Sequence, residues 1–296
     1  MAMPELEKLA MHLSATPPRT TPFALEVRKT TRFDFTDVPA IHTADNLYVS
    51  HFFNALSLVA PITEGMLIRA IRDAQPLLEG TSLVADAQAF VGQEATHTRE
   101  HRELNRRLGA LGFDVETLPA KLDALARRNE AKMSLRKRLA IVVAGEHVIY
   151  AICRAFLTCN RSKFVQHPEV TRLLAWHALE EMEHQSVCDD IYRHLFGSGP
   201  TDRLLYTTAY LGTNRVLYRA VAKLMQSLLA DDRPPRDGEL KEFRAWLFRE
   251  PGIGNVAARE LLGWFSPTFE HWRRDEDRAL IDASIRLVYG APATRG

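Results

Sequence analysis

The sequence contains few cysteines, and those present are poorly spaced for covalent or zinc chemistry. Cys153, Cys159 and Cys188 are the only three in 296 residues. Three thiols cannot form a disulfide framework, and their spacing is not that of zinc-binding pairs. The first residues also lack a basic stretch followed by an apolar one, the pattern of a secretory signal. We therefore expect a protein of a reducing compartment, the cytoplasm.

The sequence also lacks an excess of either charge and any long apolar run. It has 38 Lys and Arg against 37 Asp and Glu, a formal net charge of +1. This balance argues against a nucleic-acid partner. No continuous apolar run reaches the roughly 18 residues of a membrane-spanning helix, so no transmembrane segment is expected. The amphipathic segment 202–230 contains Arg215, Arg219 and Lys223, which leaves peripheral membrane contact open.

From about residue 46 onward, apolar residues recur three and four positions apart, which is the period of α-helices. The pattern predicts an all-α fold with helices near 47–79, 81–111, 132–162, 168–196, 202–230, 238–249 and 275–289. Residues 1–45 are expected to form an extended arm, in which 25–36 is either a short strand or an extended wrap. Residues 46–200 would form a four-helix bundle, and 201–296 a helical extension packed on it within one structural domain.

Each of the four long helices carries an apolar stripe that polar residues interrupt near its middle. The first and third helices contribute one glutamate each, whereas the second and fourth contribute a Glu-x-x-His motif, whose side chains lie one turn apart on one face. Buried carboxylates need partners, and no Lys or Arg lies in the stripes at this level. Two divalent cations would satisfy the whole layer. The pattern therefore predicts the dinuclear site of carboxylate-bridged helical bundles.

The predicted metal ligands are assigned from this pattern. Glu94 and Glu181 are expected to bridge the two metals, which would be iron, with manganese as an alternative. His177 lies one turn before Glu181, and it is either a third nitrogen ligand beside Glu146 or a core histidine. The full predicted set is Glu64, Glu94, His97, Glu146, His177, Glu181 and His184.

Several neighbours of this layer are expected to play supporting roles. His101 lies one turn beyond His97, where it would support the ligands from outside more readily than bind metal itself. Tyr150 lies one turn beyond Glu146 and is expected to pack in the core, with a donor role in the site as the alternative. Glu180 and Glu183 flank the last motif and, in this register, should point to solvent or form structural pairs.

Three segments, HFFNALSLVAP, FVGQEATHTREH and WHALEEMEHQSV, resemble the bacterial family of predicted metal-dependent hydrolases, and the likeness extends over most of the chain. The arrangement also resembles ferritin-like di-metal carboxylate proteins. This likeness implies a ferritin-like four-helix bundle with a dinuclear metal site. The predicted ligand set alone is similar to that of the di-iron arylamine N-oxygenases. It consists of His177-x-x-x-Glu181-x-x-His184 together with Glu64, Glu94, His97 and Glu146.

Three functions are compatible with these observations. The first is an O2-dependent di-iron oxidase or oxygenase that acts on a small organic molecule and uses an electron donor. The second is a metal-dependent hydrolase in which two metals activate water. The third is metal storage. The inward stripes lack Ser, Lys or Arg to stabilise an anionic intermediate, so the sequence favours oxidation over hydrolysis. A homodimer is compatible with the amphipathic C-terminal helices.

Overall fold

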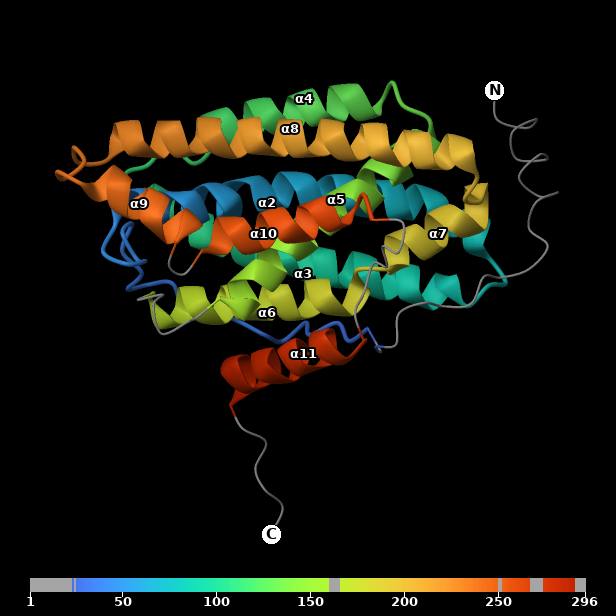
Figure 1. Cartoon of the computed structure of the whole chain (residues 1–296), viewed down its shortest axis with the longest axis horizontal. Coiled ribbons are helices and arrows are strands. Elements are labelled where there is room, and N and C mark those ends of the chain that lie inside the picture. Colours follow the sequence, from blue (N-terminus) through green and yellow to red (C-terminus); the bar gives the residue numbers. More distant parts are fainter. Residues whose placement is uncertain (1–22, 24, 160–165, 250–251, 267–273, 291–296) are drawn as a thin grey trace, which may run out of the picture.

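The computed structural model describes residues 23, 25–159, 166–249, 252–266 and 274–290, and it confirms the all-α prediction (Figure 1). Within these ranges the chain forms helices and no β-strand; segment 25–36 is extended without pairing as a strand. The expected arm before residue 23 lies outside the described residues.

The helices are α2 (Leu47–Ala74), the 3-10 turn η1 (Gln75–Leu78), α3 (Leu83–Ala110), α4 (Thr117–Glu130), α5 (Leu135–Thr158), α6 (Pro168–His184), α7 (Val187–Phe196), α8 (Pro200–Asp231), α9 (Glu239–Phe248), α10 (Ile253–Gly263) and α11 (Arg274–Tyr289).

Helices α2, α3, α5 and α6 form the centre of the molecule, and side-chain caps fix where two of them begin. The Asn46 side chain accepts hydrogen bonds from the backbone amides of Tyr48 and Val49 at the start of α2. The Ser134 hydroxyl accepts from the amide of Lys137 at the start of α5. Apolar clusters lie on both sides of the central polar layer, one containing Phe53 and Trp176 and the other Phe90 and Leu139. The finer expectation of a ferritin-like bundle stays a prediction.

The helix predicted over 168–196 is wrong in one respect, because the chain forms two helices there, α6 and α7. The first turn of α7 contains Asp189 and Asp190, which are favourable at a helix N-terminus and start a new helix after Ser186. The predicted start of the second helix at Thr81 shifts to Leu83, whose amide donates to the Thr81 hydroxyl. Pro61 lies inside α2 without ending it.

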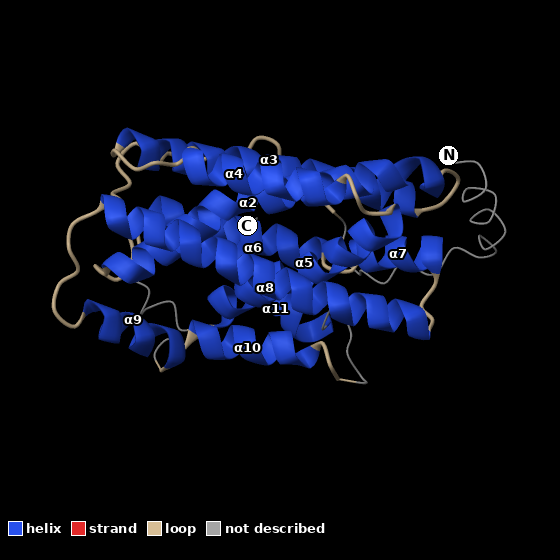
Figure 2. Ribbon diagram, turned by 90° about the horizontal axis from the view of Figure 1, so that it is seen from above, coloured by secondary structure: helices blue, strands red, loops and turns tan. Residues whose placement is uncertain are grey.

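Two helices, α4 and α10, are absent from the sequence prediction. Helix α4 lies on the periphery and has no buried residue, and the sequence analysis left its segment between the second and third predicted helices unassigned. Helix α10 lies between the predicted helices 238–249 and 275–289 and ends at Gly263; residues 267–273 after it lie outside the described part. In Figures 1 and 2, α4 and α8 lie over the central helices on one side, and α11 lies beside α6 on the other.

The extended segment before α2 lies directly against α3, and a glycine makes this approach possible. A Cβ atom at Gly92 would lie 2.8 Å from Val27 Cγ2, closer than real Cβ contacts allow. Further along, Arg107 Nε donates to the carbonyl of Val38 over 2.8 Å. The segment is thereby held on the bundle, and Arg28 reaches the side chains of α6.

Two helical stretches are long and apolar enough to cross a membrane, judged by length and composition only: Leu47–Leu78 and Leu135–Thr158. The sequence analysis expected no such stretch. Both stretches are largely buried within the fold, and they contain Glu64 and Glu146. Helices from the centre of a bundle have the same composition, so their apolar character is accounted for by packing.

Candidate metal centre

One half of the central layer is a quartet of buried donors from three helices. Glu94 comes from α3, Glu146 from α5, and Glu181 and His184 from α6; one donor atom of each lies within 4.8 Å of the others. The His184 Nε2 atom lies 3.3 Å from Glu94 Oε1 and 3.2 Å from both Glu146 Oε2 and Glu181 Oε2. All four residues of this quartet belong to the predicted ligand set.

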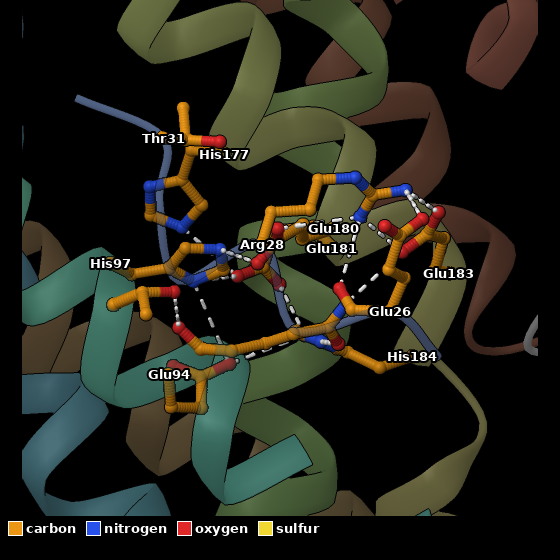
Figure 3. A network of polar contacts seen from close by, with 12 residues as sticks. Glu26, Arg28, Thr31, Glu94, His97, His177, Glu180, Glu181, Glu183 and His184 are labelled. Atoms are coloured by element: carbon orange, nitrogen blue, oxygen red, sulfur yellow. Dashed lines mark hydrogen bonds and ion pairs between the residues drawn. The ribbon is translucent and has the colours of Figure 1, made fainter. Parts of the chain in front are cut away.

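The other half of the layer gathers around His97. Glu64, Glu94 and His97 offer donor atoms within 4.8 Å of one another, as do His97, His177 and Glu181. Glu94 and Glu181 therefore belong to donor groups on both sides, as bridging carboxylates would. Figure 3 shows His97 and His177 on the side of the layer away from His184.

The structure places His177 on the other side of the layer from the one we expected. It stacks on His97, with ring centroids 4.1 Å apart, and its Nε2 lies 2.9 Å from Glu181 Oε1. Its Nδ1 lies 2.7 Å from His101 Nε2, so it lies beside His97 and not beside Glu146, where a third nitrogen ligand was one of its two predicted roles. His101 in turn contacts the Ser57 hydroxyl over 3.0 Å, but it also offers a donor atom within 4.8 Å of those of Glu64 and His177, so its supporting role stays a prediction.

The residues of this layer fit a metal because many of their polar atoms are buried without a hydrogen-bond partner. These atoms include Oε1 of Glu64 and both carboxylate oxygens of Glu94 and of Glu146. Each such atom costs about 1–3 kcal/mol or more when left unpaired. Mixed carboxylate and imidazole donors suit iron, manganese or zinc. Bound cations would satisfy these atoms together.

The proton affinities of the layer reflect crowded carboxylates in a dry interior. Burial raises the pKa of Glu64 and of Glu146 to about 7, and the charge of Glu181 adds to the effect at both. Burial and the same neighbouring charge raise the pKa of Glu94 as well. Burial opposes a charged His184, but the carboxylates of Glu181 and Glu146 prevail and raise its pKa. The metal-free layer therefore retains protons at neutral pH.

A second set of buried side chains supports the histidines from outside. The His184 Nδ1–H group donates to Gln93 Oε1 over 3.0 Å, and Gln93 Nε2 donates to Glu183 over 3.0 Å. His97 Nε2 lies 3.2 Å from Glu180 Oε2. Groups behind a ligand histidine fix its tautomer and ring orientation. His184 is thus oriented by Gln93, which Glu183 holds in turn, whereas His97 faces Glu180 without a hydrogen bond.

Arg28 joins the two outer glutamates. Its Nη1 and Nη2 atoms donate to the two carboxylate oxygens of Glu183 over 2.8 and 2.6 Å, and Nη1 also donates to Glu180 over 3.3 Å (Figure 3). The expectation that Glu180 and Glu183 could face solvent is wrong, because both are buried; the alternative of structural pairing is correct. Sequence analysis missed Arg28 and Gln93, and only the partly alternating segment 25–36 hinted at the former.

Tyr150 lies outside the centre. Its hydroxyl donates over 3.2 Å to Oδ1 of Asp277 in α11, away from the ligand layer, so its packing role is supported and the donor alternative is not.

The match to known families agrees with this geometry. The chain matches the family model described as predicted metal-dependent hydrolase over residues 27–275. It belongs to the predicted metal-dependent hydrolase family. The match begins just before Arg28, so this member of the family includes both the ligand layer and its outer support within the matched region. No curated protein and no solved structure matched the chain.

We expect metal binding to strengthen as pH rises. Ligands must lose their protons before they bind metal. This applies to Glu64 and Glu146, whose pKa values are about 7, and to His184, whose pKa is raised. Below about pH 7, each displaced proton should weaken affinity by about tenfold per pH unit. Calorimetric titration with Mn²⁺ between pH 6 and 8, in buffers of different ionisation enthalpy, measures the affinity and the number of protons released on binding. An affinity independent of pH would contradict this account.

We also expect Arg28→Met to weaken metal binding by about 10- to 100-fold, the usual effect of losing support behind ligands. The measurement is competition with a chelator, together with the visible spectrum of the Co²⁺ form. Because the change removes the cation that offsets the charges of two buried carboxylates, Arg28→Met with Glu183→Gln separates lost charge compensation from lost positioning. Arg106→Met, at an exposed arginine of α3, is the matched control. Unchanged affinity and spectrum in both Arg28 variants would contradict the role.

Proposed function

We propose that this protein is a metal-dependent hydrolase with a dinuclear centre, in which Glu94 and Glu181 bridge two ions. The observation that carries the proposal is the convergence of four glutamates and three histidines in one buried layer with unpaired oxygens. A pair of bound divalent cations would supply an activated water molecule and polarise the bond to be cleaved. Membership of the predicted metal-dependent hydrolase family supports the same reaction class.

The chain offers groups for proton transfer beside the layer. His177 contacts Glu181 through Nε2 and His101 through Nδ1, and His101 contacts Ser57, whose hydroxyl donates to Asn105. Asn105 lines a surface hollow between α2, α3 and α4. In this proposal Glu64, Glu94, His97, Glu146, Glu181 and His184 hold the two ions, and His177 does not bind metal but receives and releases the proton of the reaction. The residues behind His177 hold its orientation.

The same hollow has an exposed cation on its wall, whose charge reaches the layer. Arg102 lines the hollow, and its charge acts on Glu64 to favour the ionised carboxylate. A hydrolase needs such a donor to stabilise negative charge on its substrate, and the inward helix stripes lack one. Arg102 is the candidate for this role.

O2-dependent oxidation is the second candidate. Oxidation is favoured by the absence of Ser, Lys and Arg from the central layer itself. It is also favoured by the aromatic rings that enclose the layer: Phe90 lies edge-on to His184, and Trp176 lies edge-on to His97. A redox-active pair of iron ions would supply electrons to dioxygen, a reaction for which a dry surround is needed. Mixed carboxylate and histidine ligation suits iron.

The two candidates differ in their requirement for oxygen. We expect Mn²⁺- or Zn²⁺-loaded protein to cleave members of an ester, amide and phosphoester panel under strict anaerobic conditions. Arg102→Met should lower kcat/KM by roughly 10²- to 10³-fold, as loss of one charge-stabilising donor does. Arg219→Met, at an exposed arginine of α8 that does not line the hollow, is the control. Inert protein in this panel, together with O2 consumption by the anaerobically prepared ferrous form, would overturn hydrolysis in favour of oxidation.

A further inference from the structure

A second hollow, distinct from the metal layer, lies between the central helices and the outer pair α4 and α8. Its volume is about 530 Å³, within the range of small-molecule sites. Met66 and Leu67 of α2, and Ile141 and Gly145 of α5, line its inner wall, while Leu122 of α4 and Leu217 of α8 are among the residues opposite. Neither Glu64 nor Glu146 lines it. We call it the outer cavity.

The packing of the outer helices indicates that the outer cavity is a built space. Helix α4 buries none of its residues, although its apolar side chains Leu122 and Leu125 face this cavity, and Leu125 is 54% exposed. On α8, a Cβ atom at Gly212 would meet nothing within 4 Å. An amphipathic helix normally buries its apolar face. A ligand in the cavity would complete the burial of both helices.

The cavity is long, apolar at one end and polar at the other. Its lining on α2 runs from Val59 to Ala70, about 16 Å along the helix axis. At the Val59 end it adjoins an apolar cluster that contains Val59 itself with Leu224 and Leu228 of α8. The other end is lined by Glu130, Lys137 and Arg138.

The polar end carries unused positive charge. Within the described ranges, the Lys137 ammonium makes no hydrogen bond or ion pair, and Arg138 Nε is buried without a hydrogen-bond partner. The acidic groups nearby are already paired, since Glu130 accepts two hydrogen bonds from Arg69, and Asp73 lies 2.7 Å from Arg138 Nη1. An anionic group is the complement of this end.

From this combination we propose that the outer cavity binds a single-chain amphiphile with a carboxylate head, such as a free fatty acid. The aliphatic chain lies along α2 and α5, and the carboxylate meets Lys137 and Arg138 at the polar end. This binding site does not depend on the reaction at the metal centre. Its ligand can therefore be tested by binding alone, whatever the outcome of the hydrolysis assay.

Calorimetric titration of the full-length, metal-loaded protein with monomeric dodecanoate tests the proposal. We expect one binding site per chain, and affinity for octanoate weaker by at least about tenfold because less apolar surface is buried. Lys137→Gln should weaken dodecanoate by roughly fivefold and leave dodecanol unaffected, since only the former carries a charge. Lys132→Gln, at an exposed lysine outside the cavity, is the matched control.

Variants that fill the cavity locate the bound chain. Gly212→Phe should weaken dodecanoate at least about tenfold, whereas Gly212→Ala should bind as the unaltered protein does. Ala126→Phe on the peripheral helix α4 gives the same test if Gly212→Phe does not fold. The proposal would be overturned if the unaltered protein did not bind dodecanoate. It would also be overturned if Gly212→Phe and Ala126→Phe both bound dodecanoate as tightly as the unaltered protein. Binding to anionic phosphatidylglycerol vesicles without binding of monomeric dodecanoate would also overturn it, in favour of a membrane surface.

Discussion

The cost of burying carboxylates is the constraint on which this structure depends. Glu64, Glu94, Glu146 and Glu181 are each at most 1% exposed and lie at one level of a helical core. Ionised groups in such a place must be neutralised or paired. The histidines at the same level offer only partial compensation, because burial keeps the pKa of His97 low while that of His184 is raised. Metal binding is the compensation that uses all of these donors together.

The same constraint explains why the extended segment before α2 belongs to the site. Glu183 holds Gln93, the partner of His184, and Glu180 lies 3.2 Å from His97, yet the two glutamates add two further buried carboxylates to α6. Arg28 offsets both charges from a segment without regular structure, which Gly92 allows to lie flat on α3. The ligand layer and its outer support thus come from every central helix and from the preceding segment.

The helical core and the ligand layer could be predicted from the sequence because both depend on periodic patterns. Glu-x-x-His pairs within apolar stripes fix which side chains share a face, and the structure brings Glu94, Glu146, Glu181 and His184 together as expected. Contacts between distant segments leave no such pattern. The position of His177 beside His97, the pairing of Arg28 with Glu183, and helix α4 with no buried residue all depend on tertiary packing.

The metal content of the purified protein tests the central claim most directly. Protein reconstituted anaerobically with Fe²⁺ and freed of excess metal should retain two ions per chain, the number that a layer with two bridging carboxylates holds. Glu94→Ala should lose both ions because Glu94 belongs to both donor groups, whereas Glu103→Gln, at an exposed glutamate of the same helix, should keep them. A content of one ion or fewer in the unaltered protein, or full occupancy in Glu94→Ala, would contradict the dinuclear centre.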